Sequence, residues 1–139
     1  MDAKTPILSL LPEELEEKIA LPRYRAKQVF EWLHGKLAAT FEAMTNLPKE
    51  LRHTLEEQFL ITVLRPIASD TADDGSLKWL FETPCQDAVE SILIPTEHRR
   101  TLCISTQVGC KFGCKFCASG QAGFQRNLSA DEMIAEVLT

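Results

Sequence analysis

Hydrophobic and polar positions follow a helical period up to about residue 60 and a strand-like period after it. Three helices are expected, one beginning near Pro12, one near Arg25 and one at Pro48, because proline suits a first helical turn and apolar residues recur three or four positions apart. The apolar positions of the second and third helices are Val29, Phe30, Leu33 and Leu37, then Leu51, Leu55 and Phe59. Residues 1–60 are therefore predicted to form a small helical domain.

Residues 61–97 have the pattern of β-strands. The segment Asp73-Asp74-Gly75-Ser76 is a turn signal between two β-prone runs, so residues 61–68 and 77–82 are predicted to be the arms of a hairpin. Residues 88–94 predict a further strand, which Pro95 ends. This region is expected to lead into a second domain.

Residues 98–139 predict a strand, a cysteine-rich loop and a helix. The strand is expected at residues 101–105, and Ser129-Ala130-Asp131-Glu132 is a capping-box pattern that predicts a helix along Met133, Ile134, Val137 and Leu138. This helix has no glycine, asparagine or proline to end it before residue 139. We therefore expect the chain to be an N-terminal part of a longer protein.

Composition alone narrows the function little. The chain is 45% hydrophobic and 25% charged, as in ordinary globular domains, and no apolar run reaches the roughly 20 residues of a membrane span. A net charge of −5 argues against a generally basic nucleic-acid-binding protein. Residues 98–130, however, contain five basic residues and no acid. That stretch suits an anionic ligand such as an RNA backbone, or it is a solvated loop that lacks acids.

Cys110, Cys114 and Cys117 form a C-x3-C-x2-C triplet that can hold one compact inorganic centre. Zinc normally takes a second cysteine pair or histidines, and the nearest histidine, His98, precedes the triplet by twelve residues. Disulfides are disfavoured because the five cysteines are an odd number and no signal peptide is evident. The triplet favours a 4Fe–4S cluster. Three thiolates leave one iron open for chemistry, whereas four hold an ordinary electron-transfer cluster.

The triplet and its flanks resemble one family of enzymes. With Phe116 as its aromatic residue, the motif is similar to that of radical S-adenosylmethionine enzymes. The segments Thr101-Leu102-Cys103-Ile104-Ser105-Thr106-Gln107-Val108-Gly109 and Gly123-Phe124-Gln125-Arg126-Asn127-Leu128 resemble the RlmN/Cfr family of RNA adenine methyltransferases. Tyr24-Arg25-Ala26-Lys27-Gln28-Val29-Phe30-Glu31-Trp32-Leu33 and Met44-Thr45-Asn46-Leu47-Pro48 resemble that family's N-terminal domain.

The resemblance implies an α/β protein whose part in this chain is α+β. Residues 1–60 would be a helical accessory domain that contacts RNA, although the residues alone favour a packing domain with exposed charges. Residues 61–97 would be the hairpin region. Residues 98–139 would supply the first strand, cluster loop and helix of a partial (β/α) barrel.

The implied reaction is methylation of C2 of adenine in large-subunit ribosomal RNA and in transfer RNA, through a methyl-cysteine intermediate. The implied cofactors are a 4Fe–4S cluster on Cys110, Cys114 and Cys117 and S-adenosylmethionine. The implied partners are the two RNAs and an electron donor such as flavodoxin or ferredoxin, for a monomeric, cytoplasmic enzyme. Alternatives are C8-directed methylation, an electron-transfer protein with a fourth ligand, and an RNA-binding module with a vestigial cysteine loop.

Two further residues are candidates for catalysis. Glu90 shares a strand face with Ile92 and Ile94, so we expect partial desolvation, which suits a carboxylate to proton transfer. A frayed or edge strand is the alternative, and the resemblance implies that Glu90 is the proton acceptor. Cys103 as a lone strand cysteine would ordinarily be inert. The resemblance implies a resolving cysteine that pairs transiently with a C-terminal cysteine absent from this chain.

Other residues near the triplet have weaker assignments. Arg126 and its neighbours, which are Gly120, Gly123, Phe124 and Asn127, are expected to shape the loop, although tight turns alone would explain the glycines. Cys85 has no implied role.

Overall fold

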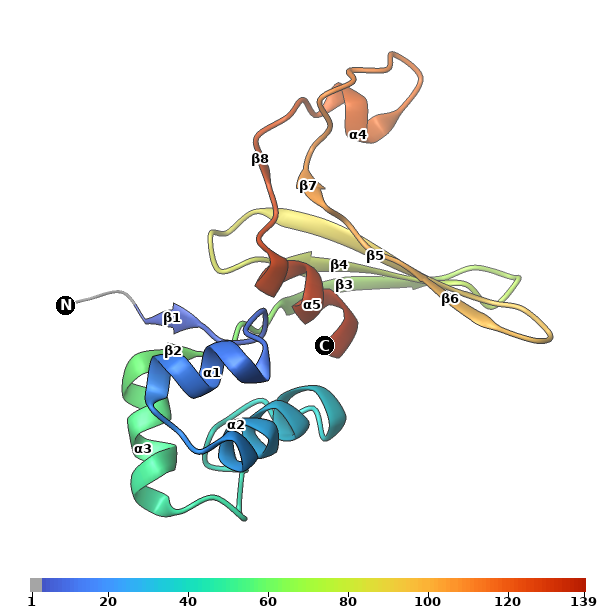
Figure 1. The fold of residues 1–139 in the computed structure, drawn as a ribbon. Coiled ribbons are helices and arrows are strands. Elements are labelled where there is room, and N and C mark those ends of the chain that lie inside the picture. The colour runs from blue at the N-terminus through green and yellow to red at the C-terminus, as the bar shows by residue number, and fades with distance from the viewer. Residues whose placement is uncertain (1–3) are drawn as a thin grey trace. The chain divides into compact units, whose positions relative to one another are not determined.

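The computed structural model describes residues 4–139, and the chain divides into two compact units between Thr62 and Val63. Helices make up most of the first unit, and an antiparallel sheet is the centre of the second (Figure 1). The expected α+β class is confirmed. No helix within residues 4–139 is long and apolar enough to cross a membrane.

The first unit is a group of short helices around an apolar core. Its elements are β1 (Thr5–Pro6), α1 (Pro12–Ile19), α2 (Arg23–Phe30), the π-helix η1 (Glu31–Gly35), α3 (Lys49–Gln58) and β2 (Phe59–Leu60). Strands β1 and β2 pair in parallel. The core contains fully buried side chains from each helix: Leu15, Ala26, Val29, Leu33 and Leu55. The three predicted helices are therefore present.

The sequence pattern predicts that Leu37 continues the apolar stripe of the second helix, but in the structure it does not. The helix widens into η1, where the Lys36 amide donates to the Glu31 carbonyl at 2.9 Å, and ends at Gly35. Leu37 then has a positive φ of 54° and an exposed side chain. A left-handed backbone cannot extend a right-handed helix, so Leu37 leaves the core.

The second unit is built on a four-stranded antiparallel sheet in chain order. Its strands are β3 (Arg65–Thr71), β4 (Leu77–Glu82), β5 (Ala88–Pro95) and β6 (Arg100–Cys103). The predicted hairpin is β3–β4, although its first strand begins at Arg65 and not at residue 61. Strand β6 pairs with β5 in antiparallel fashion. A parallel barrel pairing of β6 stays a prediction.

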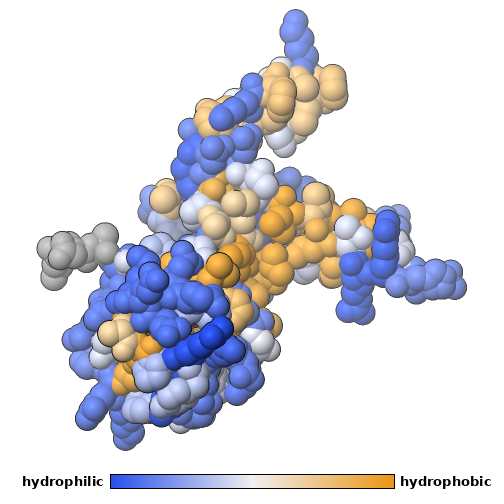
Figure 2. All heavy atoms as spheres, in the orientation of Figure 1, coloured by the Kyte–Doolittle hydropathy of each residue, from blue (hydrophilic) through white to orange (hydrophobic). Residues whose placement is uncertain are grey.

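One face of this sheet is apolar and lies against helix α5 (Ala130–Leu138). The residues Trp79, Phe81, Leu93 and Leu102 line a cavity of about 350 Å³ on this face, together with Pro66 and the α5 residues Glu136 and Val137 and the adjacent Thr139. Figure 2 shows hydrophobic surface over the sheet in this view. The sheet therefore presents apolar side chains to the helix that follows the cysteine loop.

Helix α5 begins as predicted but turns an unexpected face inward. The Glu132 amide donates to Ser129 Oγ at 3.2 Å, and the Ser129 amide donates to Glu132 Oε2 at 2.8 Å, which is the predicted capping box. Its buried residues are Asp131, Glu132, Ala135 and Glu136, whereas Val137 is exposed. The buried face of this helix is therefore mainly acidic.

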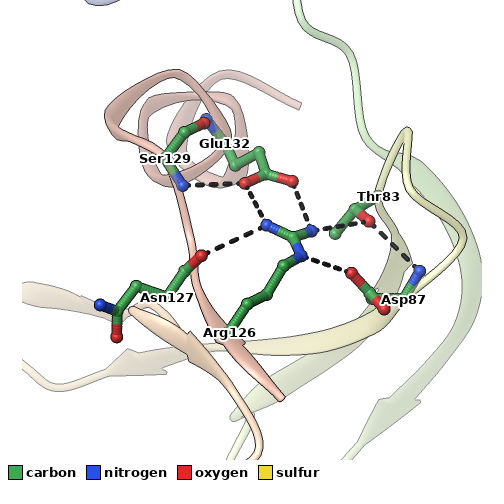
Figure 3. A network of polar contacts seen from close by, with 6 residues as sticks. All are labelled: Thr83, Asp87, Arg126, Asn127, Ser129 and Glu132. Atoms are coloured by element: carbon green, nitrogen blue, oxygen red, sulfur yellow. Dashed lines mark hydrogen bonds and ion pairs between the residues drawn. The ribbon is translucent and has the colours of Figure 1, made fainter.

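Two of the three buried carboxylates on this face, those of Glu132 and Glu136, have different environments. Glu132 accepts two hydrogen bonds from the Arg126 guanidinium, and these hold the pKa of Glu132 below its usual range (Figure 3). Glu136 Oε2 accepts hydrogen bonds from the Ser91 hydroxyl and the Ser105 amide. Burial nevertheless raises the pKa of Glu136, and its Oε1 has no hydrogen-bond partner within residues 4–139.

We predict that Glu136→Gln becomes more stable relative to the parent chain as pH rises. The parent's Glu136 is protonated in both states below its unfolded pKa of about 4.5. Above that pH the unfolded chain ionises first, so the parent's free energy of unfolding falls as pH rises through the higher folded pKa. Urea denaturation of both proteins from pH 4 to pH 8 measures this difference.

Glu132→Gln is the matched control, because its pKa shift has the opposite sign. The ion pair of Glu132 with Arg126 stabilises the parent above pH 4.5, and this stabilisation is lost as pH falls through the lowered folded pKa. The free energy of unfolding of the parent should therefore increase relative to that of Glu132→Gln as pH rises. Parallel pH dependences for the two variants would contradict this assignment.

Candidate functional site

The three cysteines of the triplet lie in a loop that closes on itself at its base. Strands β7 (Gln107–Val108) and β8 (Arg126–Asn127) pair in antiparallel fashion on either side of it. The Gln125 amide donates to the Val108 carbonyl at 3.0 Å, and the Cys110 amide donates to the Gly123 carbonyl at 3.2 Å. Figure 1 shows the loop, with helix α4 (Ala118–Gln121), extending away from the sheet. Its shape is thus set mainly by its own backbone.

Two glycines allow backbone segments of this loop to approach each other. A Cβ atom on Gly109 would lie 1.6 Å from the Gly123 carbonyl oxygen, and Gly109 has a positive φ of 74°. A Cβ atom on Gly120 would lie 2.7 Å from the Cys114 nitrogen and 2.8 Å from its oxygen. Both contacts exclude any larger residue, so the cysteine segment is packed against the returning half of the loop.

Cys110, Cys114 and Cys117 are half-buried free thiols. The Cys117 amide donates to the Cys114 carbonyl at 3.1 Å, so these two residues bracket one tight turn before α4. Three soft thiol donors in one closed loop fit an iron–sulfur cluster chemically. Within residues 4–139, however, no three His, Cys, Asp or Glu side chains are gathered as a metal-binding group. The gathering of the three thiols around one centre therefore stays a prediction.

Aromatic and basic residues lie between and beside the three cysteines in the sequence of the loop. Phe112 is 89% exposed and Phe116 is 92% exposed, and Lys111 Nζ lies 4.5 Å from the centre of the Phe124 ring. These residues lie in the stretch that contains no acid. The loop thus has a cationic, aromatic outer surface.

Glu90 lies on β5, on the sheet face opposite the apolar one. Its carboxylate is 3.3 Å from Lys78 Nζ on the neighbouring strand, and its side chain is 52% exposed. The expected desolvation of Glu90 is therefore absent, because Val89 and Ser91 occupy the buried face and Glu90 the solvated one. Its role as proton acceptor remains a prediction.

Glu90 and Cys110 nevertheless line the same hollow, of about 510 Å³. The β5 wall consists of Ala88, Val89 and Glu90, and the opposite wall includes Gly109, Cys110 and residues of α4. The Ser105 hydroxyl, just before the loop, donates to the Glu90 carbonyl at 2.8 Å. The predicted base and one predicted cluster ligand are thus brought together, although they are twenty positions apart in the sequence.

Cys103 is an exposed free thiol at the end of β6. It is directly opposite Ile92 in the strand register, and Ile92 shares its face with Glu90. Cys103 and Glu90 therefore lie on the same face of the sheet. Cys85 is also an exposed free thiol, in the turn between β4 and β5.

The sequence predicts only that Arg126 helps to shape the loop, and it does not predict the residues that Arg126 contacts. Its guanidinium donates to Glu132, to Asp87 at 2.7 Å and to Thr83 at 3.3 Å (Figure 3). The sequence shows only that acidic residues follow Arg126 a few positions later, and this does not identify its partners.

Comparisons with known proteins agree on one family. Residues 7–61 match the family described as "Ribosomal RNA large subunit methyltransferase N-terminal domain". The chain is 45% identical over 128 residues to a "Probable dual-specificity RNA methyltransferase RlmN" of Bacillus pumilus, a match that covers 92% of this chain and 35% of that protein. It is 44% identical over 137 residues to the "Dual-specificity RNA methyltransferase RlmN" of Francisella tularensis subsp. novicida, covering 96% of this chain and 37% of that protein.

A solved structure extends the agreement to the fold. The crystal structure of a radical SAM methyltransferase from Sphaerobacter thermophilus matches with a TM-score of 0.88 and 43% identity, covering 96% of this chain and 40% of that one. The chain thus spans less than half the length of the relatives that it matches.

We predict that Gly109→Ala opens the base of the cysteine loop. The new Cβ atom would collide with the Gly123 carbonyl, and the left-handed backbone adds about 1–2 kcal/mol of strain. Loss of the Cys110 hydrogen bond should speed exchange of its amide proton at least tenfold, since about 1.4 kcal/mol corresponds to a factor of ten. Amide hydrogen exchange followed by NMR measures the effect.

Gly113→Ala is the matched control. Gly113 also has a positive φ, of 59°, but a Cβ atom added there would have no atom within 4 Å, so only the backbone strain applies. Equal exchange of the Cys110 amide in the two variants would show that the Gly109–Gly123 contact does not close the loop.

Proposed function

We propose that the chain is a member of the RlmN family and forms the N-terminal part of an enzyme that methylates C2 of adenine in ribosomal and transfer RNA. One observation supports this most directly: Glu90 and Cys110, a candidate base and a candidate cluster ligand, line one hollow. The named relatives are RNA methyltransferases, and the related solved structure is a radical SAM methyltransferase. We also propose that the RNA substrate binds at this hollow and that the complete enzyme is cytoplasmic.

Cys110, Cys114 and Cys117 are the residues that would hold a 4Fe–4S cluster. When bound, such a cluster supplies the electron that starts cleavage of S-adenosylmethionine, and a flavodoxin or ferredoxin would be the source of that electron. The chain's own contribution is the closed loop, which holds the three cysteines within one short segment. Three protein ligands leave one iron for the cofactor.

Glu90 would accept the proton that the adenine ring loses. A carboxylate serves as a base when its charged form is available and the proton lies within hydrogen-bond reach. The Glu90 carboxylate lies 3.3 Å from Lys78 Nζ, is 52% exposed and lines the hollow, so it is accessible from it. Proton acceptance at Glu90 therefore needs no buried carboxylate in this chain.

Cys103 would act as the resolving cysteine. Its exposed thiol shares a sheet face with Glu90, so a sulfur on another segment of the complete protein can reach it without disturbing the sheet's apolar side. The methyl-cysteine route through a C-terminal cysteine is proposed on the family resemblance. Attack of the Cys103 thiolate on the sulfur of the alkylated cysteine would form the disulfide as the sulfur–carbon bond to the RNA breaks, and the released carbon would take the electron pair and a proton to become the methyl group.

The helical unit offers a surface for RNA. The Arg25 guanidinium lies 5.1 Å from the Tyr24 ring centre, and Lys36 Nζ lies 4.0 Å from that of Trp32. Asn46 holds both pairs in place, because Arg25 donates to its carbonyl and Trp32 donates to its side chain. Ordered aromatic rings next to cations suit stacked bases and phosphates. We propose that this surface contacts the RNA substrate.

Anaerobic reconstitution with iron and sulfide tests the cluster assignment. The parent chain should take up close to four irons per chain. Cys110→Ala should lose most of the iron and the broad visible absorbance, because one of three ligands is removed. Cys85→Ala, which removes an exposed thiol in the β4–β5 turn, is the control and should bind iron like the parent. Full iron in Cys110→Ala would refute the ligand set.

Glu90→Gln tests the base in the complete protein. Glutamine keeps the size of the side chain and its hydrogen bonding but cannot accept a proton. Cluster content and cleavage of S-adenosylmethionine should therefore persist, while methylated adenine falls by about 10²–10⁴-fold. Both products are quantified by mass spectrometry of one anaerobic sample. Unchanged methylation by a folded Glu90→Gln protein would remove Glu90 from the mechanism.

A further inference from the structure

Arg126 on β8 connects the nearby start of α5 to the turn between β4 and β5, which lies about forty positions earlier in the sequence. Its Nη1 and Nη2 each donate to one Glu132 oxygen at 2.8 Å, and its Nε donates to Asp87 Oδ2 at 2.7 Å. Its Nη2 also lies 3.3 Å from Thr83 Oγ1 (Figure 3). One side chain thus links β8, the turn between β4 and β5, and the first turn of α5.

The position of Arg126 in the backbone makes these contacts relevant to the cysteine loop. Arg126 is directly opposite Val108 in the β7–β8 pair, which is the closed base of the loop. The loop beyond this base is held mainly by its own backbone hydrogen bonds and glycine contacts. Whatever orients the base therefore orients the loop as one piece.

The Asp87 contact connects that base to the other wall of the hollow. Asp87 comes directly before β5, which supplies Ala88, Val89 and Glu90 to the hollow, and the loop supplies Gly109 and Cys110. The hydrogen bond from Arg126 to Asp87 thus joins the two walls at one end. Ser105, through its bond to the Glu90 carbonyl, joins them near the start of the loop.

The network is sheltered enough to hold its geometry. The exposed fractions of the side chains are 8% for Glu132, 19% for Asp87 and 31% for Arg126. Arg126 meets Glu132 through two parallel hydrogen bonds, an arrangement that fixes the orientation of both groups. Only arginine has the planar fork that can reach Glu132 and Asp87 together.

We infer that Arg126 is a positioning residue, which sets the placement of the cysteine loop relative to Glu90 and so couples cofactor cleavage to methylation. This inference rests on the proposed function. Because the three thiols belong to the loop itself, disturbing Arg126 changes where the loop lies and not whether it can hold a cluster. Arg126 itself touches no reacting atom in this role.

Amide hydrogen exchange on the cluster-free chain tests the anchoring. In Arg126→Gln, the amides of Gln125 and Leu128, which donate to Val108 and Thr106 at the loop base, should exchange at least tenfold faster. The amides that form hydrogen bonds between the paired strands β4 and β5 should keep their parent exchange rates. Arg65→Gln is the matched control, because Arg65 also contacts a glutamate, Glu82, through two nitrogens but lies at the sheet edge. It should leave the loop base unchanged.

The ratio of methylated adenine to cleaved S-adenosylmethionine in the complete protein tests the positioning. Arg126→Gln should keep iron content and cleavage near parent levels and lower this ratio at least tenfold. Arg126→Lys keeps the charge without the fork and should recover part of the ratio; if Arg126→Gln does not fold, the ratio of Arg126→Lys decides. Arg65→Gln should retain the parent ratio.

Two outcomes would overturn the inference. One is a parent-like ratio in both Arg126 variants. The other is a loss of methylation that only follows loss of iron or of folded protein. A parent protein that binds no cluster or cleaves no S-adenosylmethionine would instead refute the proposed function, so the two failures are distinguishable.

Discussion

The salt bridge between Arg126 and Glu132 is the interaction on which the second unit depends. Helix α5 lies against an apolar sheet face yet turns carboxylates inward, which is costly unless each carboxylate is paired. Arg126 meets Glu132 with two hydrogen bonds, and the sheet and the Ser105 amide supply the partners of Glu136. The same contacts orient the segment that leads from the cysteine loop into the helix. Packing of the helix and placement of the loop are therefore one structural problem.

The elements with strong local signals could be predicted from the sequence. Pro12 and Pro48, the turn before Leu77 and the capping box at Ser129 each act over a few residues, and the corresponding helices, hairpin and helix start are present. Leu37 shows where local periodicity fails. Its spacing fits the helix, but the π-turn before it and its left-handed backbone end the stripe. The spacing of apolar residues does not predict this change from α-helix to π-helix.

The site divides in the same way between local and long-range features. The cysteine spacing and the glycines define a closed loop, which the sequence indicates because its closing contacts all lie within residues 106–128. The environment of Glu90 was not predictable. Period two gives the two faces of β5 but not which one faces solvent, and that depends on α5, which begins forty residues later. The partners of Arg126 are equally remote, at Thr83 and Asp87.

This division has a consequence for how the hollow can work. The cysteine loop closes through its own backbone hydrogen bonds, whereas the position of Glu90 is fixed by the register of β5 with β4 and β6. The distance between the cysteine loop and Glu90 depends on the side chains that connect them, which are Arg126 and Ser105. Those connections are polar, directional and partly exposed at Arg126, in contrast to the packed apolar side of the sheet. Directional hydrogen bonds from Arg126 and Ser105 therefore connect the walls of the hollow, so a change at either bond alters the placement of the cysteine loop relative to Glu90 before it alters the apolar packing of the sheet.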